Sequence, residues 1–223
     1  MDGTGIAYDS FIAALGPSYI VKVVQYPTTE PLSYSELEVI ARAHIPSDGP
    51  FIILGESFSG PIAVSLAASC SSQLKGLILC CSFVKNPQPL FSGFKSLADM
   101  LPVSIMPQAL LSYFLLGPFS NSALRSSLSR ALSMISPSVF STRLKAVLSV
   151  NVSEKLSAVK VPVLYLRALQ DRVVPRASSE LVLLLNSHSK VVEIEAPHFL
   201  LQTAPVEAAQ AVSAFTLDVQ NIF

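Results

Sequence analysis

The sequence predicts an α/β protein whose mostly parallel sheet is covered by helices on both faces. Short apolar runs recur along the chain and alternate with amphipathic, helix-like segments. Strands that are apolar throughout are typical of a sheet buried on both sides. Hydrophobic residues make up 51% of the 223 residues and charged residues only 13%, whereas about 25% is usual for the charged fraction. A chain of this size and composition can build one substantial core.

The expected elements follow one another along the chain. They are a helix ending near residue 15, a strand over 19–24, a helix from about 34 to 44, strands over 51–54, 76–83 and 161–166, a helix over 178–185, a strand over 190–194, and a last helix from about 203 towards 215. Ser33 and Glu36 form a capping box that begins the second helix. From Lys85 to about Ser157 the alternation stops, and prolines and helical apolar patches take its place. We therefore expect an α/β core at 1–84 and 158–223, with a mostly helical insertion at 85–157.

The segment 51–67 reads as a strand, a sharp turn and a helix. Its turn, Gly55-x-Ser57-x-Ser59, is a one-residue variant of the G-x-S-x-G pattern, in which a strained serine stands above the end of a buried sheet. Small residues are needed on either side of the serine, and Gly60 allows the helix to pack closely. Similar turns also bind phosphate or are purely structural, but the lysine of a P-loop and the G-x-G-x-x-G pattern are absent from the sequence. The turn therefore favours a nucleophile over a structural role.

A serine nucleophile needs a base, and the base needs a group that orients it. Of the three histidines, His198 alone follows a predicted strand, and ligand sites lie at the carboxyl ends of parallel strands. His44 and His188 lie in segments that lead into strands. Asp171 also follows a strand, although a turn aspartate or helix cap would explain it when taken alone. Ser57, Asp171 and His198 thus occur in this order, each just past a predicted strand.

With these residues the chain resembles an α/β-hydrolase of the serine esterase or lipase type. The resemblance covers most of the chain, and the insertion at 85–157 takes the place of the family's helical cap. It implies that Ser57 is the nucleophile, that His198 is the general base and acid, and that Asp171 fixes the imidazole tautomer. It also implies that the amide of Phe58, the residue after the nucleophile, donates one hydrogen bond in the oxyanion hole.

The amino-terminal end departs from the family pattern. Members usually begin with further strands and a loop that supplies the second oxyanion amide. Here Met1, Asp2 and Gly3 resemble the tail of that loop, which implies a second donor near Met1 or Asp2. By the same comparison a strand is missing between the 19–24 and 51–54 strands, and unpaired backbone groups there would be costly. Either the 19–24 strand moves into the slot, or a partner chain covers it, or the chain is a shortened version of a longer protein.

The triad implies acyl transfer without a cofactor or a metal, and the cap would select the acyl group. The uncharged stretch 100–124 offers apolar side chains, Phe114 and Leu115 among them, and no basic residue to hold a carboxylate or phosphate. These side chains either seat the cap on the core or line an apolar pocket, which would favour esters of short to medium acyl chains. The alternatives are a thioesterase, peptidase, lactonase or cofactor-free peroxidase on the same scaffold, or a non-catalytic binding member with an incomplete oxyanion hole.

Charge and cysteine content limit the partners and the compartment. The 15 basic and 15 acidic residues balance and form no basic stripe, which argues against nucleic acid. Neither a signal peptide nor a stable membrane span is expected. Cys80 and Cys81 stand together in an apolar strand and are expected to be buried thiols in a reducing cytoplasm. An exposed sheet edge at a shortened amino end would allow a homodimer.

Overall fold

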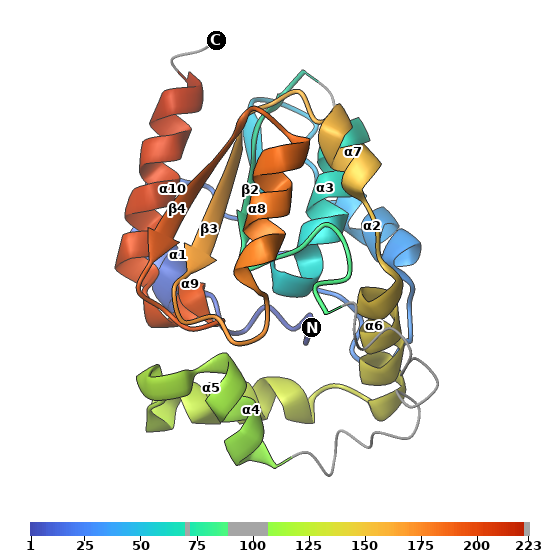
Figure 1. The fold of residues 1–223 in the computed structure, drawn as a ribbon, viewed down its shortest axis with the longest axis vertical. Helices are drawn as coiled ribbons and strands as arrows, with labels where there is room; N and C mark the ends of the chain where they lie inside the picture. The colour runs from blue at the N-terminus through green and yellow to red at the C-terminus, as the bar shows by residue number, and fades with distance from the viewer. Residues whose placement is uncertain (70–71, 89–106, 221–223) are drawn as a thin grey trace.

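The computed structural model describes residues 1–69, 72–88 and 107–220, and a parallel sheet of four strands runs through its centre (Figure 1). The strands are β1 (Phe51–Glu56), β2 (Leu74–Cys80), β3 (Val163–Ala168) and β4 (Ser189–Ile194), paired in that order. All three pairings are parallel, with Leu54 opposite Ile78 and Leu79 opposite Tyr165. The carboxyl ends of the strands therefore lie at one edge of the sheet. The predicted α/β class is confirmed.

Helices cover both faces of the sheet. One face carries α1 (Asp9–Leu15), α9 (Leu200–Thr203) and α10 (Pro205–Gln220), and the other carries α3 (Gly60–Ser69), α7 (Ser153–Ala158) and α8 (Arg176–Leu185). Successive side chains of a strand point to opposite faces. In β2, Ile78 and Cys80 accordingly lie in the core beneath α10, while Leu77 and Leu79 lie in the core beneath α3.

The remaining helices lie beside this core and before β3. They are α2 (Tyr34–Arg42), α4 (Gln108–Leu115), the 3-10 turn η4 (Gly117–Phe119), α5 (Ser122–Ser133) and α6 (Pro137–Ser149). The capping box of α2 is present: the Glu36 amide donates to Ser33 Oγ, and the Ser33 amide donates to the Glu36 carboxylate. The described part of the expected insertion is largely helical, while its stretch 89–106 lies outside the described residues.

The prediction of a strand over 19–24 is wrong. This segment has no regular secondary structure, and the side chain of Ile20 is fully exposed. A β-branched run becomes a strand only where a neighbouring strand offers hydrogen bonds and an apolar face to pack on. Within the described residues β1 is the outermost strand on this side of the sheet, so the segment does not move into the slot beside it.

None of the helices that the structure describes has both the length and the apolarity that crossing a membrane requires.

Candidate active site

The turn between β1 and α3 is a short 3-10 helix, η1 (Ser57–Ser59), with Ser57 at its first position. Ser57 has a φ of +48°, a left-handed conformation that is strained for a residue with a side chain. Its neighbours must be small: a Cβ on Gly55 would lie 2.7 Å from the Cβ of Ala63, and a Cβ on Gly60 would lie 1.7 Å from Ser82 Oγ. The close packing of the helix on the strand therefore explains both glycines.

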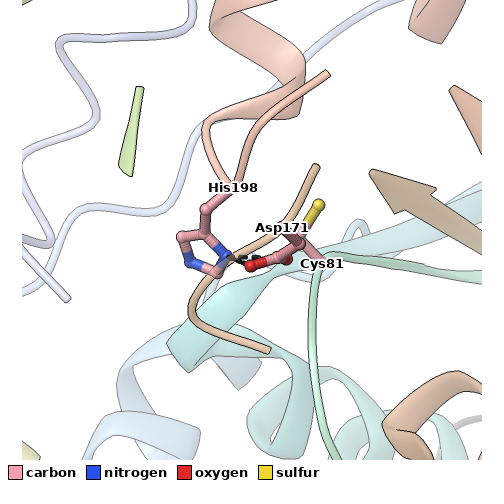
Figure 2. Close-up of side chains that lie close together, drawn as sticks. All are labelled: Cys81, Asp171 and His198. Atoms are coloured by element: carbon pink, nitrogen blue, oxygen red, sulfur yellow. Dashed lines mark hydrogen bonds and ion pairs between the residues drawn. The ribbon is translucent and has the colours of Figure 1, made fainter. Parts of the chain in front are cut away.

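Ser57, His198 and Asp171 form one continuous chain of hydrogen bonds. Ser57 Oγ lies 2.8 Å from His198 Nε2, and His198 Nδ1 lies 2.9 Å from Asp171 Oδ2 (Figure 2 shows the histidine–aspartate pair). Asp171 lies in the loop after β3 and His198 in the loop after β4. The amides of Val173 and Val174 donate to Asp171 Oδ1 at 2.8 and 2.9 Å, which fixes the carboxylate. Because an ionised carboxylate only accepts, the imidazole carries its proton on Nδ1 and presents the lone pair of Nε2 to Ser57.

The two segments expected to form the oxyanion hole meet at one arginine. Arg143 Nη1 donates to the carbonyl of Met1 at 2.6 Å and to that of Asp2 at 2.9 Å. The same guanidinium lies 5.9 Å from the ring centroid of Phe58. That ring is buried and stacks on Tyr34, whose hydroxyl donates to the Phe58 carbonyl at 3.1 Å. Arg143 thus brings Phe58 close to Met1 and Asp2 in space, although more than 50 residues separate them in the sequence.

Arg143 was not predicted as a site residue. It lies on α6, is 1% exposed, and also donates to the carbonyl of Pro27 at 2.8 Å. The sequence carries no signal for this role, because an arginine in a helix of an inserted segment is usually at the surface. Its partners lie 116 to 142 positions away in the chain.

A buried carboxyl group, that of Glu56, lies directly before Ser57 in the chain. Glu56 Oε2 accepts from the hydroxyl of Tyr8 at 2.8 Å and from Gln202 Nε2 at 3.3 Å, whereas its buried Oε1 has no hydrogen-bond partner. Burial raises the pKa of Glu56, and the hydrogen bonds from Tyr8 and Gln202 oppose this shift only in part. The sequence placed Glu56 in the turn pattern but did not indicate that its carboxyl group is buried.

Helix α4 is attached to both loops that carry the histidine and the aspartate. The amide of Phe199 donates to the carbonyl of Leu115 at 3.1 Å. Arg172 donates to the carbonyl of Tyr113 at 2.9 Å, and its guanidinium lies 4.2 Å from that ring's centroid. The apolar stretch 100–124 therefore has a basic neighbour that its own sequence lacks. Leu115 is half-buried, and Phe114 is 41% exposed.

A cavity of about 440 Å³ lies where η4 and α5 meet α1 and α9. Its lining includes Phe119, Leu124 and Gln202, but neither Phe114 nor Leu115. Gln202 lines this cavity and also donates to the carboxyl of Glu56, the residue before Ser57.

Among the described residues, one group of side chains has the composition and spacing to hold a metal ion. It consists of Cys81, Asp171 and His198, with one donor atom from each, all within 4.8 Å of one another.

A serine turn after one parallel strand, an acid loop after a later strand and a histidine loop after the last strand are the architecture of α/β hydrolases. The chain belongs to this superfamily and, within it, to the family described as serine aminopeptidase, S33, whose model matches residues 36–197. The α/β-hydrolase fold expected from the sequence is confirmed.

Solved structures agree in fold at low sequence identity. A hydrolase from Oleispira antarctica superposes with a TM-score of 0.82 and 16% identity, over 99% of this chain and 88% of that one. A thermophilic esterase from Thermogutta terrifontis superposes with a TM-score of 0.75 and 19% identity, over 97% of this chain and 86% of that one. The enol-lactonase from Burkholderia xenovorans superposes with a TM-score of 0.71 and 13% identity, over 99% of this chain and 88% of that one. No curated protein sequence matches the chain.

Proposed function

We propose that the protein is a serine hydrolase that cleaves carboxylic esters of short to medium apolar acyl chains. The observation that carries this proposal is the hydrogen-bonded chain from Ser57 Oγ through His198 to Asp171, with distances of 2.8 and 2.9 Å. A hydroxyl becomes an effective nucleophile when a base within hydrogen-bond reach takes its proton and a third group orients that base.

The chemistry follows from the atoms in this chain. His198 Nε2 accepts the proton of Ser57 as its oxygen attacks the ester carbonyl, and Asp171 stabilises the imidazolium that forms. His198 then returns the proton to the departing alcohol, which leaves an acyl group on Ser57. A water molecule, deprotonated by the same nitrogen, releases the acid. The proposed reaction steps use no cofactor and no metal.

The tetrahedral intermediate needs donors for its oxyanion. We assign one to the amide of Phe58 and the second to the segment of Met1 and Asp2, whose carbonyls Arg143 holds. A donor of this kind lowers the activation barrier by about 3 kcal/mol.

The helical segment 85–157 acts as the cap in this proposal. Phe114 and Leu115 on α4 would contact the acyl chain, because the hydrogen bond from Phe199 to Leu115 holds this helix against the histidine loop. Phe119 and Leu124, which line the nearby cavity, would extend the same apolar surface.

A fluorophosphonate probe tests the nucleophile directly. The intact protein should be labelled on Ser57 and should hydrolyse short-chain p-nitrophenyl esters, while Ser57→Ala should do neither. Ser59→Ala, which removes a hydroxyl two residues away, is the matched control and should keep both properties. Equal labelling of the intact protein and Ser57→Ala, or no labelling of either, would leave a non-catalytic binding protein. Thioesters, lactones and aminoacyl p-nitroanilides belong in the same panel, because the triad serves those reactions as well.

A further inference from the structure

The thiol of Cys81 lies beside the aspartate–histidine pair, in a backbone position that is itself unusual. Cys81 follows β2 and is 1% exposed, and its amide donates to the carbonyl of Leu166 at 3.0 Å. Its φ is +45°, and only Cys81 and Ser57 among the described non-glycine residues have a positive φ. Strained residues of this kind concentrate at functional sites, where the surrounding structure holds them. Figure 2 shows Cys81 and His198 on either side of the Asp171 carboxylate.

The three side chains offer the donor types that zinc prefers. Thiolate sulfur, imidazole nitrogen and carboxylate oxygen are its usual ligands, and the donors in this cluster all lie within 4.8 Å of one another. Donors of a tetrahedral zinc site are about 3.3–3.7 Å apart, given metal–donor distances of about 2.0–2.3 Å. Asp171 Oδ2 and His198 Nδ1, now 2.9 Å apart, would separate slightly, and the thiol would approach by up to about 1 Å.

The carboxylate is already held as a metal ligand would be. Two backbone amides, those of Val173 and Val174, bind Asp171 Oδ1. Both carboxylate oxygens face His198 Nδ1, with Oδ2 at 2.9 Å slightly closer than Oδ1 at 3.1 Å. Outer hydrogen bonds of this kind orient the ligands of metal sites. A Cys81 thiolate and the Asp171 carboxylate together carry two negative charges, so a divalent ion would leave this buried cluster neutral.

We propose that Cys81, Asp171 and His198 form an inhibitory site for Zn²⁺, which binds between the aspartate and the histidine and switches off the nucleophile. On binding, Cys81 releases its proton to solvent and coordinates as thiolate. The imidazole stays neutral: the metal takes Nδ1, so its single proton moves to Nε2. That nitrogen then donates to Ser57 Oγ and cannot accept its proton. The site releases one proton for each ion bound.

Metal binding is measured in the Ser57→Ala variant, without an affinity tag, so that the result does not depend on hydrolysis. Calorimetry with Zn²⁺ should show one ion per chain, and titration with Co²⁺ should give a near-ultraviolet thiolate-to-cobalt charge-transfer band. Adding Cys81→Ser should weaken zinc binding at least tenfold and abolish the band, whereas Cys80→Ser, the matched neighbour, should keep both. Undiminished binding by Cys81→Ser would overturn the proposal, since it would indicate another site, such as the histidines His44 and His188.

A second variant and a rate measurement complete the test. If Cys81→Ser fails to fold, Asp171→Asn in the Ser57→Ala background should weaken binding by a similar factor, and full affinity there would overturn the site. In the intact protein, Zn²⁺ should slow fluorophosphonate labelling and Mg²⁺ should not, because Mg²⁺ requires oxygen ligands. Inhibition that persists in a folded Cys81→Ser protein would contradict the proposal.

Discussion

The hydroxyl of Ser82 donates a 2.6 Å hydrogen bond to the carbonyl of Ser57 and thereby ties the end of β2 to the turn that carries the proposed nucleophile. Ser82 is itself fixed by Tyr165 on β3: the Ser82 amide donates to the tyrosine hydroxyl, which donates to the Ser82 carbonyl. Strained backbone persists only where its surroundings leave no alternative. This connection explains how Ser57 keeps a φ of +48°.

The same contact predicts the effect of a side chain at Gly60. In Gly60→Ala the added Cβ would lie 1.7 Å from Ser82 Oγ and 2.7 Å from Ser82 Cβ, so the start of helix α3 and Ser82 must move apart and the hydrogen bond from Ser82 to Ser57 is disturbed. We expect a loss of about 3 kcal/mol or more in the free energy of unfolding, measured by urea titration. Gly49→Ala, where no atom lies within 4 Å, is the control and should lose only the strain of its positive φ, about 1 kcal/mol. Equal losses in the two variants would mean that packing against Ser82 is not the cause.

Asp171→Asn tests the tautomer argument. An asparagine can present its NH₂ group to His198 Nδ1, which forces the imidazole proton onto Nε2, where it blocks acceptance of the Ser57 proton. We expect kcat for ester hydrolysis to fall by about three to four orders of magnitude with KM nearly unchanged. Asp218→Asn, an exposed change on α10, should leave both constants as they are. A loss of less than tenfold in Asp171→Asn would argue against the triad.

Arg143→Met probes the contact between the amino-terminal segment and Phe58. The substitution removes the donors to the carbonyls of Met1, Asp2 and Pro27 while it keeps an unbranched apolar stem. We expect a destabilisation of about 3 kcal/mol or more, because hydrogen bonds to charged groups contribute about 1.5–3 kcal/mol each. The kcat of the folded fraction should fall as well. Arg143→Lys, which cannot reach Asp2 and Pro27 together, should be intermediate. Full activity of folded Arg143→Met would argue that the segment of Met1 and Asp2 does not form part of the oxyanion hole.

The stability of the protein should depend on pH through Glu56. Burial raises the pKa of this carboxyl in the folded state above its ordinary value of 4.5. The folded state therefore binds the proton more tightly, so the associated stability is complete below the ordinary value and is lost as pH rises through the folded pKa. Glu56→Gln, which keeps an oxygen for Tyr8, should have a higher Tm than the parent at about pH 8, and the difference should vanish near pH 4.5. The exposed Glu30→Gln should show no such trend, and a gain that does not vary with pH would exclude titration of Glu56 as its cause.

Helix α4 should influence chain-length preference. If Phe114 and Leu115 contact the acyl chain, Phe114→Ala and Leu115→Ala should shift the ratio of kcat/KM between p-nitrophenyl butyrate and octanoate by roughly tenfold, since a lost apolar contact is worth about 1–3 kcal/mol. Phe119→Ala, in the lining of the adjacent cavity, tells the two surfaces apart. A shift in Phe119→Ala alone would move the acyl pocket to that cavity and leave Phe114 and Leu115 with a packing role.

One physical reason explains both the successes and the failure of the sequence prediction. The four strands and the capping box of α2 were predictable because apolar runs and turn chemistry are local properties of the chain. The strand expected over 19–24 failed because a β-branched run without a neighbouring strand to pair with has nothing to stabilise it. The positions of Asp171 and His198 could be inferred because each directly follows a strand, and parallel strands end at one edge of the sheet.

By itself, the sequence determined the α/β architecture, the turn around Ser57 and the order in which Ser57, Asp171 and His198 follow their strands. Only the tertiary structure decided the surroundings of these residues. Arg143 reaches Met1 across 142 positions. Glu56 at the end of β1 and Cys81 and Ser82 directly after β2 gather around the same site. Local periodicity specifies which face of an element is buried, but which polar groups share that buried space depends on how the elements pack. For that reason the three proposed catalytic residues were visible in the sequence and the groups that hold them in place were not.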